Sequence, residues 1–192
     1  MSSNPNLAVK STESRVGREN QRFNPESGAR MVAGCICLNE TRDKVVMILS
    51  SVHKNKWVLP KGGIELDEGE DFVISAVRET WEEAGCEGRI LEKLPVVYDL
   101  RGAKAPVLEG EDQKKDFDPK KFIPKLEFHF YTMEVVQLST TWPELDVRSR
   151  RWCTYSEAKH ELMKSKRPEL VQALEYSCMV KDVEAPVDVD AY

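Results

Sequence analysis

One segment, residues 71–84, constrains the fold and chemistry of this chain more than any other. Its hydrophobic side chains recur at the three- and four-residue spacing of an amphipathic helix, and Gly85 follows as a typical helix stop. Three of its carboxylates fall within one arc of the helix, roughly opposite the apolar residues. These carboxylates belong to Glu79, Glu82 and Glu83. The pattern therefore predicts an acidic face on a single helix.

An acidic helix face is usually a solvated surface, but the surroundings of this one favour a metal site. Like charges at this spacing destabilise an isolated helix by roughly 0.2–0.5 kcal/mol per pair unless a cation neutralises them. Gly62 and Gly63 follow an apolar run at residues 57–60 and allow the backbone to turn tightly toward the helix. Clustered oxygen ligands suit Mg²⁺, with Mn²⁺ as the second candidate, and these ions bridge to substrate phosphates. We therefore predict a divalent-metal site for phosphoryl chemistry.

The rest of the sequence predicts one α/β (α+β) domain with a mixed sheet. Apolar runs at residues 31–38 and 44–49 indicate a β-hairpin, and further strands are expected at the start of the glycine turn and later in the chain. These later strands are expected within residues 57–60, 89–100, 126–136 and 150–156. Two closing helices are expected, the first through about Lys164 with Ser156 as N-cap, the second from Pro168 to about Ser177.

The ends of the chain and one long loop differ from this domain in composition. Residues 1–24 lack hydrophobic periodicity and residues 179–192 are acidic, so we expect tails on either side of a domain at residues 25–178. The polar stretch at residues 101–124 is long for a loop inside a compact domain. It is predicted to be either a flap that contacts substrate or a disordered insertion.

Composition excludes several classes of protein. The longest apolar runs are far shorter than the roughly 20 residues of a membrane span, and a net charge of −5 disfavours a stable nucleic-acid partner. The five cysteines lack C-x-x-C spacing, which argues against a zinc site and favours reduced packing residues. The first residues have no signal-peptide pattern, so we expect a cytoplasmic or nuclear protein without a membrane anchor.

The run RETWEEAGC at residues 78–86, preceded by Gly62, resembles the Nudix box. The resemblance implies an αβα sandwich around a mixed sheet and hydrolysis of a diphosphate linked to another moiety. It implies that Glu79, Glu82 and Glu83 are catalytic residues and metal ligands, and that Arg78 holds them in place. Thr80 and Cys86 stand where the family prefers aliphatic residues.

The interval between Gly62 and Arg78 is two residues longer than in the family pattern, or one residue longer if Gly63 is the first glycine. Either Glu68 or Glu70 then corresponds to the loop glutamate of the box. Glu70 immediately precedes the apolar periodicity, where a carboxylate meets the free N–H groups of a helix start. We therefore predict Glu70 as the supporting residue.

Several stretches outside the box resemble fungal diphosphoinositol polyphosphate and diadenosine polyphosphate phosphohydrolases, over about residues 17–178. They include RMVAGC, SSVHKNKWVLPKGG, EFHFY and KRPEL. The resemblance implies removal of the β-phosphate of diphosphoinositol polyphosphates and cleavage of diadenosine hexa- and pentaphosphate, with inorganic polyphosphate as a further candidate.

The basic residues near the predicted site favour a highly anionic small molecule as the substrate, because basic side chains donate charge-assisted hydrogen bonds to phosphate oxygens. The candidate substrate-binding residues are Arg30, Ser51, His53, Lys56, Lys61, Gly62, Gly63, His129, Arg151 and Lys166. The later basic groups rank below the residues near the glycine turn, because pairing with the excess acidic side chains is an alternative explanation for them; they are Arg150, Arg151, Lys166 and Arg167.

Two other functions are compatible with the same residues. A nucleotide- or RNA-cap-directed pyrophosphatase would need an aromatic stacking pair beside the site, with Trp57, Phe128 or Tyr131 as candidates. A Nudix-fold module that binds phosphate without catalysis normally follows loss of a box glutamate, and Glu79, Glu82 and Glu83 are all present. A Mg²⁺-dependent phosphate-release assay separates these classes.

Overall fold

The structure, a computed structural model, describes residues 10–15, 17–101 and 124–182. The predicted loop at residues 101–124 therefore lies almost entirely outside the described residues, as does most of the acidic C-terminal end. The strands are β1 (Arg30–Leu38), β2 (Val45–Leu49), β3 (Trp57–Val58), β4 (Lys61–Gly63), β5 (Cys86–Lys93), β6 (Val97–Asp99), β7 (Leu126–Leu138) and β8 (Arg150–Cys153). The helices are α1 (Val73–Ala84), α2 (Tyr155–Lys164) and α3 (Pro168–Tyr176), with a 3₁₀ turn, η1, at Leu66–Glu68.

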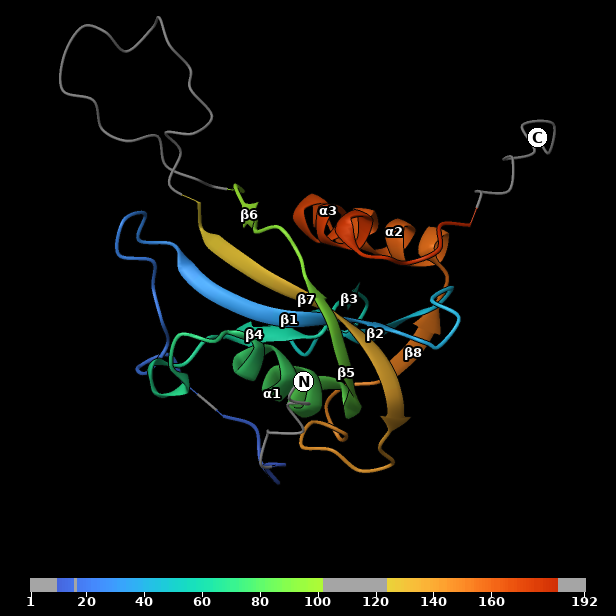
Figure 1. The fold of residues 1–192 in the computed structure, drawn as a ribbon, viewed down its shortest axis with the longest axis horizontal. Coiled ribbons are helices and arrows are strands. Elements are labelled where there is room, and N and C mark those ends of the chain that lie inside the picture. Colours follow the sequence, from blue (N-terminus) through green and yellow to red (C-terminus); the bar gives the residue numbers. More distant parts are fainter. Residues whose placement is uncertain (1–9, 16, 102–123, 183–192) are drawn as a thin grey trace, which may run out of the picture.

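These elements form a mixed sheet between two layers of helix, as predicted. The sheet runs in the order β3-β2-β1-β7-β5, with β4 beside β1, β6 beside β7 and β8 beside β2. The central strands β1 and β7 are parallel, whereas β2 and β4 pair with β1 antiparallel. Figure 1 shows α1 on one side of the sheet and α2 and α3 on the other.

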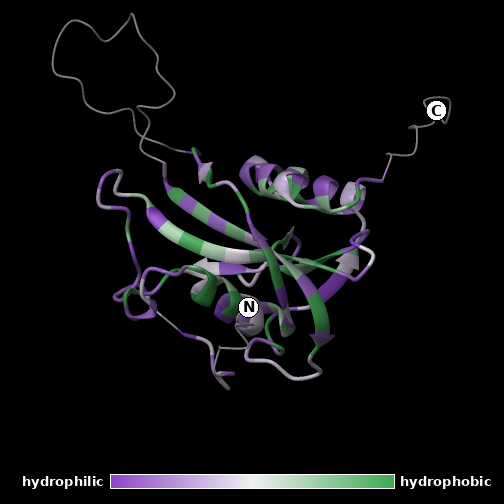
Figure 2. Cartoon of the chain, viewed as in Figure 1, coloured by the Kyte–Doolittle hydropathy of each residue, from purple (hydrophilic) through white to green (hydrophobic). Residues whose placement is uncertain are grey.

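The hydrophobic pattern explains this layering. Most of β1 is buried, and its residues Cys35 and Cys37 have fully buried side chains. In Figure 2 the first half of β7 alternates between hydrophilic and hydrophobic residues, because its two faces meet different neighbours. Phe128 and Phe130 stack against each other at 5.9 Å between ring centroids, whereas His129, between them in the sequence, contacts Phe72 at the start of α1.

The ends of the helices follow local capping rules, with one difference from prediction. Helix α1 ends at Gly85, whose φ of 59° is left-handed, as expected for a glycine stop. Helix α2 is capped by Thr154 and not by Ser156, because the Thr154 hydroxyl accepts from the Glu157 amide and the Glu157 side chain returns to the Thr154 amide. Ser156 instead bonds Asp182 through its amide and its hydroxyl.

Contacts with the domain extend beyond the predicted boundaries of residues 25–178. Gln21 and Phe23 form isolated bridges with Glu65 and Arg30, and Val180 donates its amide to the Arg42 carbonyl at 2.8 Å. All five cysteines are free thiols, and Cys35 and Cys37 are buried, as predicted for this apolar run. Within residues 10–15, 17–101 and 124–182, no helix is both long and apolar enough to cross a membrane.

Candidate functional site

Strand β4 brings the glycine pair against helix α1. A side chain at Gly62 would have its Cβ only 2.0 Å from the carboxylate carbon of Glu79, so the glycine makes room for that carboxylate. The Gly63 carbonyl accepts a hydrogen bond from Nη2 of Arg78 at 2.9 Å. The pairing of β4 with β1 holds both glycines in place, with Val32 opposite Gly63 and Ala33 opposite Gly62. The turn predicted from these glycines therefore borders the acidic helix.

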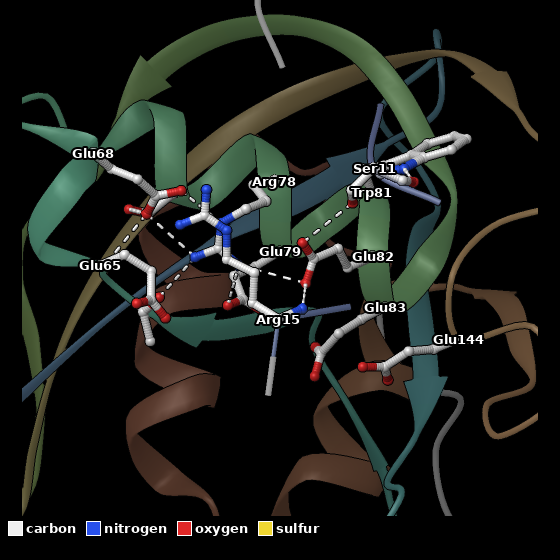
Figure 3. Close-up of polar contacts among 12 residues, drawn as sticks. Ser11, Arg15, Glu65, Glu68, Arg78, Glu79, Trp81, Glu82, Glu83 and Glu144 are labelled. Carbon is white, nitrogen blue, oxygen red and sulfur yellow. Dashed lines mark hydrogen bonds and ion pairs between the residues drawn. The ribbon is translucent and has the colours of Figure 1, made fainter. Parts of the chain in front are cut away.

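Arg78 is the buried centre of a network that ties the loop to the helix (Figure 3). Its Nε donates to Oε1 of Glu68 at 2.5 Å, and its Nη1 donates to Oε1 of Glu79 at 2.7 Å. Nη1 also lies 3.5 Å from Oε2 of Glu82. Burial disfavours the charged guanidinium, but Glu68 and Glu79 outweigh this and raise the pKa of Arg78. Arg78 is thus placed to orient the glutamates, as the box resemblance implies.

The loop glutamate that supports Arg78 is Glu68, whereas we predicted Glu70. The Glu68 side chain is 6% exposed and also accepts hydrogen bonds from the Ser75 hydroxyl and the Glu65 amide. The Glu70 side chain is 86% exposed and pairs with Arg22 on the surface. The prediction for Glu70 is wrong because η1 folds Glu68 back toward the helix.

The start of α1 explains the same error. Helix α1 begins at Val73, and the side chain of Asp71, not that of Glu70, accepts the Val73 amide at 3.2 Å. The extra residues of the loop therefore lie after Glu68, between η1 and the helix. Counting five residues on from Gly62 would have identified Glu68 correctly.

Glu82 and Glu83 are buried and Glu79 is partly buried, and desolvation raises the pKa of each. For Glu79 the pKa rises to about 8, because burial and the charges of Glu83 and Glu82 together outweigh the attraction of Arg78. Glu82 is 2% and Glu83 7% exposed. Oε2 of Glu83 accepts the Lys61 amide at 2.8 Å. Carboxylates in such a site gain from a neighbouring cation.

This donor set fits a divalent metal ion. Hard carboxylate oxygens are the ligands of Mg²⁺ and Mn²⁺, and Glu79, Glu82 and Glu83 are the residues that would hold the ion. In the described part of the chain no three acidic, histidine or cysteine side chains converge closely enough to bind a metal as they stand. Glu83 is directed to Lys61 and Arg148, and Glu82 to the residues before position 16. Binding would exchange part of the Glu83 contacts for the ion.

Two basic residues, Arg148 and Lys61, contact Glu83. Arg148 forms ion pairs with Glu83 and with Glu144. The Glu144 amide donates a hydrogen bond to the Glu82 carbonyl at 3.1 Å, which holds this loop against the end of α1. Lys61, partly buried, donates its Nζ to the Leu59 carbonyl at 3.2 Å. Burial lowers the pKa of Lys61 to about 8; the Glu83 charge opposes this, and Arg167 and Arg148 reinforce it. We name Lys61, Arg148 and Arg167 the basic trio.

Sequence reasoning missed Arg148 and Glu144 and ranked Arg167 low. Nothing in the sequence links the loop before β8 to α1, and this contact forms only in the folded chain. Arg167 has its guanidinium 5.8 Å from the Phe128 ring centroid and bonds Glu169 through Nε at 2.5 Å. Its buried Nη2 has no hydrogen-bond partner among the described residues.

Lys166, which precedes Arg167 and was predicted to bind substrate, is exposed. It adopts a left-handed φ of 56°, and its carbonyl accepts Nη1 of Arg101 at 2.8 Å. This turn at the end of α2 directs the next residue, Arg167, toward the sheet.

Other predicted substrate-binding residues divide between the site and the surface. Arg30 lies close enough to Glu79 and Glu65 to interact electrostatically, and its Nε donates to Gln21 at 2.5 Å. Ser51 and His53 are exposed in the loop between β2 and β3.

Lys56, in the same loop, is half-buried, and its side chain makes no hydrogen bond within the described part of the chain. Arg151 stacks on Trp57 at 4.3 Å and pairs with Glu161. The structure therefore brings Arg30, Lys61 and the glycine pair to the glutamates, but not this loop or Arg151.

His129 belongs to a separate buried cluster. It shares one face of β7 with Glu127, as predicted, and the two side chains are 2.8 Å apart. Asn24 bonds the other oxygen of Glu127 at 2.7 Å. Burial lowers the pKa of His129, and the nearby Glu127 offsets only part of this effect. With 6% exposure, His129 packs beneath the start of α1 and does not line the outer rim of the sheet.

A mixed sheet between helices, with an arginine-clamped acidic helix beside a glycine turn, defines a Nudix-type fold and site. The NUDIX domain family model matches residues 28–174 of this chain. The chain belongs to the Nudix family, whose hydrolases use divalent metal ions such as Mg²⁺ and act on phosphorylated small molecules.

Several relatives share this assignment. The chain is 34% identical over 159 residues to Nudix hydrolase 21, chloroplastic, of Arabidopsis thaliana, covering 80% of this chain and 70% of that protein. It is 32% identical over 187 residues to Nudix hydrolase 4 of the same plant, covering 92% and 80%. These relatives are named hydrolases. The chloroplastic name does not bear out a cytoplasmic or nuclear location, which stays a prediction.

The chain is also similar to a further relative over part of its length and to a solved structure. Over 73 residues the chain is 37% identical to diphosphoinositol polyphosphate phosphohydrolase 3-alpha of Mus musculus, covering 38% of this chain and 43% of that protein. A solved NUDIX hydrolase from Nitrosomonas europaea superposes with a TM-score of 0.52 at 14% identity, covering 77% of this chain and 86% of that one. The structural likeness supports the fold alone.

Proposed function

We propose that this Nudix protein removes the β-phosphate of diphosphoinositol polyphosphates and cleaves long diadenosine polyphosphates, such as the hexa- and pentaphosphate. Inorganic polyphosphate is a further candidate substrate. All of these molecules carry phosphoanhydride bonds and a high density of negative charge. The likeness to the mouse diphosphoinositol polyphosphate phosphohydrolase supports the first of them over part of the chain.

The observation that carries this proposal is the basic trio: Lys61 and Arg148 contact Glu83 of the acidic helix, and Arg167 lies close enough to Lys61 to interact with it electrostatically. Arg148 contacts Glu83 directly, and Lys61 donates its amide to the same carboxylate. Arg167 retains a buried Nη2 without a hydrogen-bond partner in the described part of the chain. Guanidinium and ammonium groups bind phosphate oxygens through strong charge-assisted hydrogen bonds. A substrate with several adjacent phosphates would use more of these donors than a simple nucleoside diphosphate.

The mechanism assigns distinct roles to the residues of the site. A bound Mg²⁺ supplies polarisation of phosphate oxygens and a lowered pKa for the attacking water. Glu79, Glu82 and Glu83 would hold the ion, and Arg78 fixes Glu79 through Nη1. Burial raises the pKa of Glu79 in the metal-free chain, whereas a bound cation would favour its charged form, whose carboxylate oxygen would be able to accept a proton. Lys61 and Arg148 would stabilise charge on the departing phosphate.

A nucleotide- or cap-directed hydrolase is the second candidate, favoured by a different feature. A cavity of about 230 Å³ lies between residues 10–12 and two indole rings, those of Trp81 and Trp142. Nucleobases stack on aromatic side chains, and both indoles line this cavity. The candidates predicted for this role, Trp57, Phe128 and Tyr131, do not line this cavity.

The test compares kcat/KM for diphosphoinositol pentakisphosphate, diadenosine hexaphosphate and a capped dinucleotide, with Mg²⁺ under one set of conditions. The proposal predicts the highest value for the inositol substrate, with diadenosine hexaphosphate second. A higher value for the capped dinucleotide would favour the second candidate. Tight binding of all three without phosphate release would identify a non-catalytic binding module and reject both enzymatic functions.

A further inference from the structure

Residues 10–15, which we name the N-terminal strap, lie across helix α1 although the sequence predicted a polar tail there. Nε1 of Trp81 donates to the Ser11 carbonyl at 3.1 Å. Lys10 pairs with Glu87 at 2.8 Å beyond the end of the helix. At the other end of the strap, Arg15 pairs with Asp67 of η1 at 3.0 Å. The strap is thus attached on both sides of the acidic face.

Between these attachments the strap reaches Glu82, as Figure 3 shows. The Arg15 amide donates to Oε2 of Glu82 at 3.2 Å, and the Ser11 hydroxyl donates to Oε1 at 3.4 Å. Each carboxylate oxygen therefore has one donor from the strap. Nη1 of Arg78 also lies 3.5 Å from Oε2, so three donors face this carboxylate. Because a carboxylate offers about four lone-pair sites, a position remains on Oε1 for a metal ion.

We infer that the strap is part of the metal site: the Arg15 main-chain amide and the Ser11 hydroxyl position Glu82 as a metal ligand. This inference rests on the proposed metal-binding role of Glu82. Neutral donors that bond a carboxylate favour its charged form, which is the form that binds metal. They also restrict its rotation, so that less freedom is lost when the ion binds. Hydrogen-bond partners of metal ligands typically contribute about 10–100-fold in metal affinity or activity.

The strap allows its backbone and side-chain contributions to be separated at one residue. Only the amide of Arg15 bonds Glu82, whereas its guanidinium bonds Asp67. Arg15→Pro removes the amide donor, and Arg15→Ala keeps that donor but removes the ion pair. Both variants lose the same surface ion pair, so Arg15→Ala is the matched control. Arg15 is exposed and outside every helix and strand, so neither substitution disturbs the core.

The experiment measures Mn²⁺ affinity of the full chain without substrate, from the electron paramagnetic resonance signal of free Mn²⁺. We expect Arg15→Pro to weaken binding about 10–100-fold and Arg15→Ala to stay within about twofold of wild type. Ser11→Ala, which removes the longer hydrogen bond, should weaken binding by a smaller factor. In a Glu82→Gln background, Arg15→Pro should cause no further loss, because the positioned ligand is already gone.

The outcomes separate this inference from the function on which it rests. If Glu82→Gln leaves Mn²⁺ affinity unchanged, the metal-binding role of Glu82 fails and the inference fails with it. If Glu82→Gln weakens binding but Arg15→Pro and Ser11→Ala bind like wild type, the inference alone is overturned. Tighter binding by Arg15→Pro would also overturn it, by showing that the strap competes with the metal. Thermal unfolding of each variant checks that a loss of affinity is not a loss of fold.

Discussion

Arg78 and Glu68 form a buried ion pair, ten residues apart in sequence, that joins the 3₁₀ turn after the glycines to the acidic helix. Removing one partner of a buried pair leaves the other charge uncompensated and costs about 3–5 kcal/mol. Because Arg78 keeps Glu79 as a partner, we expect Glu68→Ala to lower the free energy of unfolding by about 3 kcal/mol. Glu70→Ala, at an exposed surface pair, should change it by no more than about 0.5 kcal/mol. Urea denaturation of both variants checks this, and the reverse order would restore Glu70 as the supporting residue.

The contact between Gly62 and Glu79 predicts a loss of activity with little loss of stability. In Gly62→Ala the new Cβ would overlap the Glu79 carboxylate, which is the flexible end of its side chain and is able to move. Displacement of a catalytic group by about 1 Å costs up to 10²-fold in rate, so we expect turnover to fall at least about tenfold. The thermal midpoint should shift by only a few degrees.

The control for this variant is a double-mutant cycle. Gly62→Ala added to Glu79→Ala should reduce turnover no further, because the clash requires the carboxylate. Additive losses would show that the alanine acts on the backbone of β4 instead.

Neutralising Lys61 should weaken binding of highly phosphorylated substrates. A hydrogen bond to a charged group contributes about 1.5–3 kcal/mol, so Lys61→Met should raise the KM for diphosphoinositol pentakisphosphate about tenfold or more. Lys56→Met is the matched control, since that lysine lies in the loop between β2 and β3, and should change KM less than threefold. Equal effects of the two substitutions would place the substrate nearer the loop than the basic trio.

The raised pKa of Glu79 predicts how the stability of the metal-free protein depends on pH. Glu79 titrates near pH 8 in the folded chain but near 4.5 when unfolded, so between these values the folded state binds one more proton. Stability must therefore fall as pH rises, by up to about 1.4 kcal/mol per pH unit from this group. Below about pH 7, His129 opposes this slope, because its pKa is lowered on folding and the unfolded chain binds the extra proton. The slope is therefore measured between pH 7.0 and 7.5, where His129 is mostly unprotonated in both states. Denaturation in EDTA measures the slope.

Glu79→Gln is the control for this slope, because the amide does not titrate. We expect the variant to show a flatter dependence of stability on pH over the same interval. An identical slope in wild type and variant would assign the extra proton to another group.

The fold was predictable because periodicity and turn residues act locally. The hairpin of β1 and β2, helix α1 and its stop at Gly85 all follow from spacing within a short stretch of chain. Arg78 and the three helix glutamates could be predicted in the same way, since fewer than two helical turns carry them. The box resemblance then identified what such a turn does.

The residues that sequence reasoning missed are positioned by contacts between distant parts of the chain. Arg148 reaches Glu83 across 65 residues, and the Arg15 amide reaches Glu82 across 67. No periodicity connects such pairs. Arg167 and Lys166 are neighbours with opposite surroundings, which depends on the left-handed turn at Lys166. Glu68 was ranked below Glu70 because a short 3₁₀ turn has no repeating hydrophobic pattern to mark it.

The most direct test of the metal-dependent hydrolysis proposed for this helix is the Mg²⁺-dependent turnover of Glu83→Gln with diphosphoinositol pentakisphosphate, compared with wild type. Glu83→Gln loses the ion pair with Arg148, but Arg148 keeps Glu144 as a partner and glutamine keeps the shape of the side chain, so the variant should remain folded with a lowered thermal midpoint. We expect phosphate release to fall by a factor on the order of 10² or more, as for the loss of a strong electrostatic contribution to the transition state. Turnover close to wild type in a folded, Mg²⁺-saturated Glu83→Gln protein would contradict the assignment of this carboxylate to the reaction.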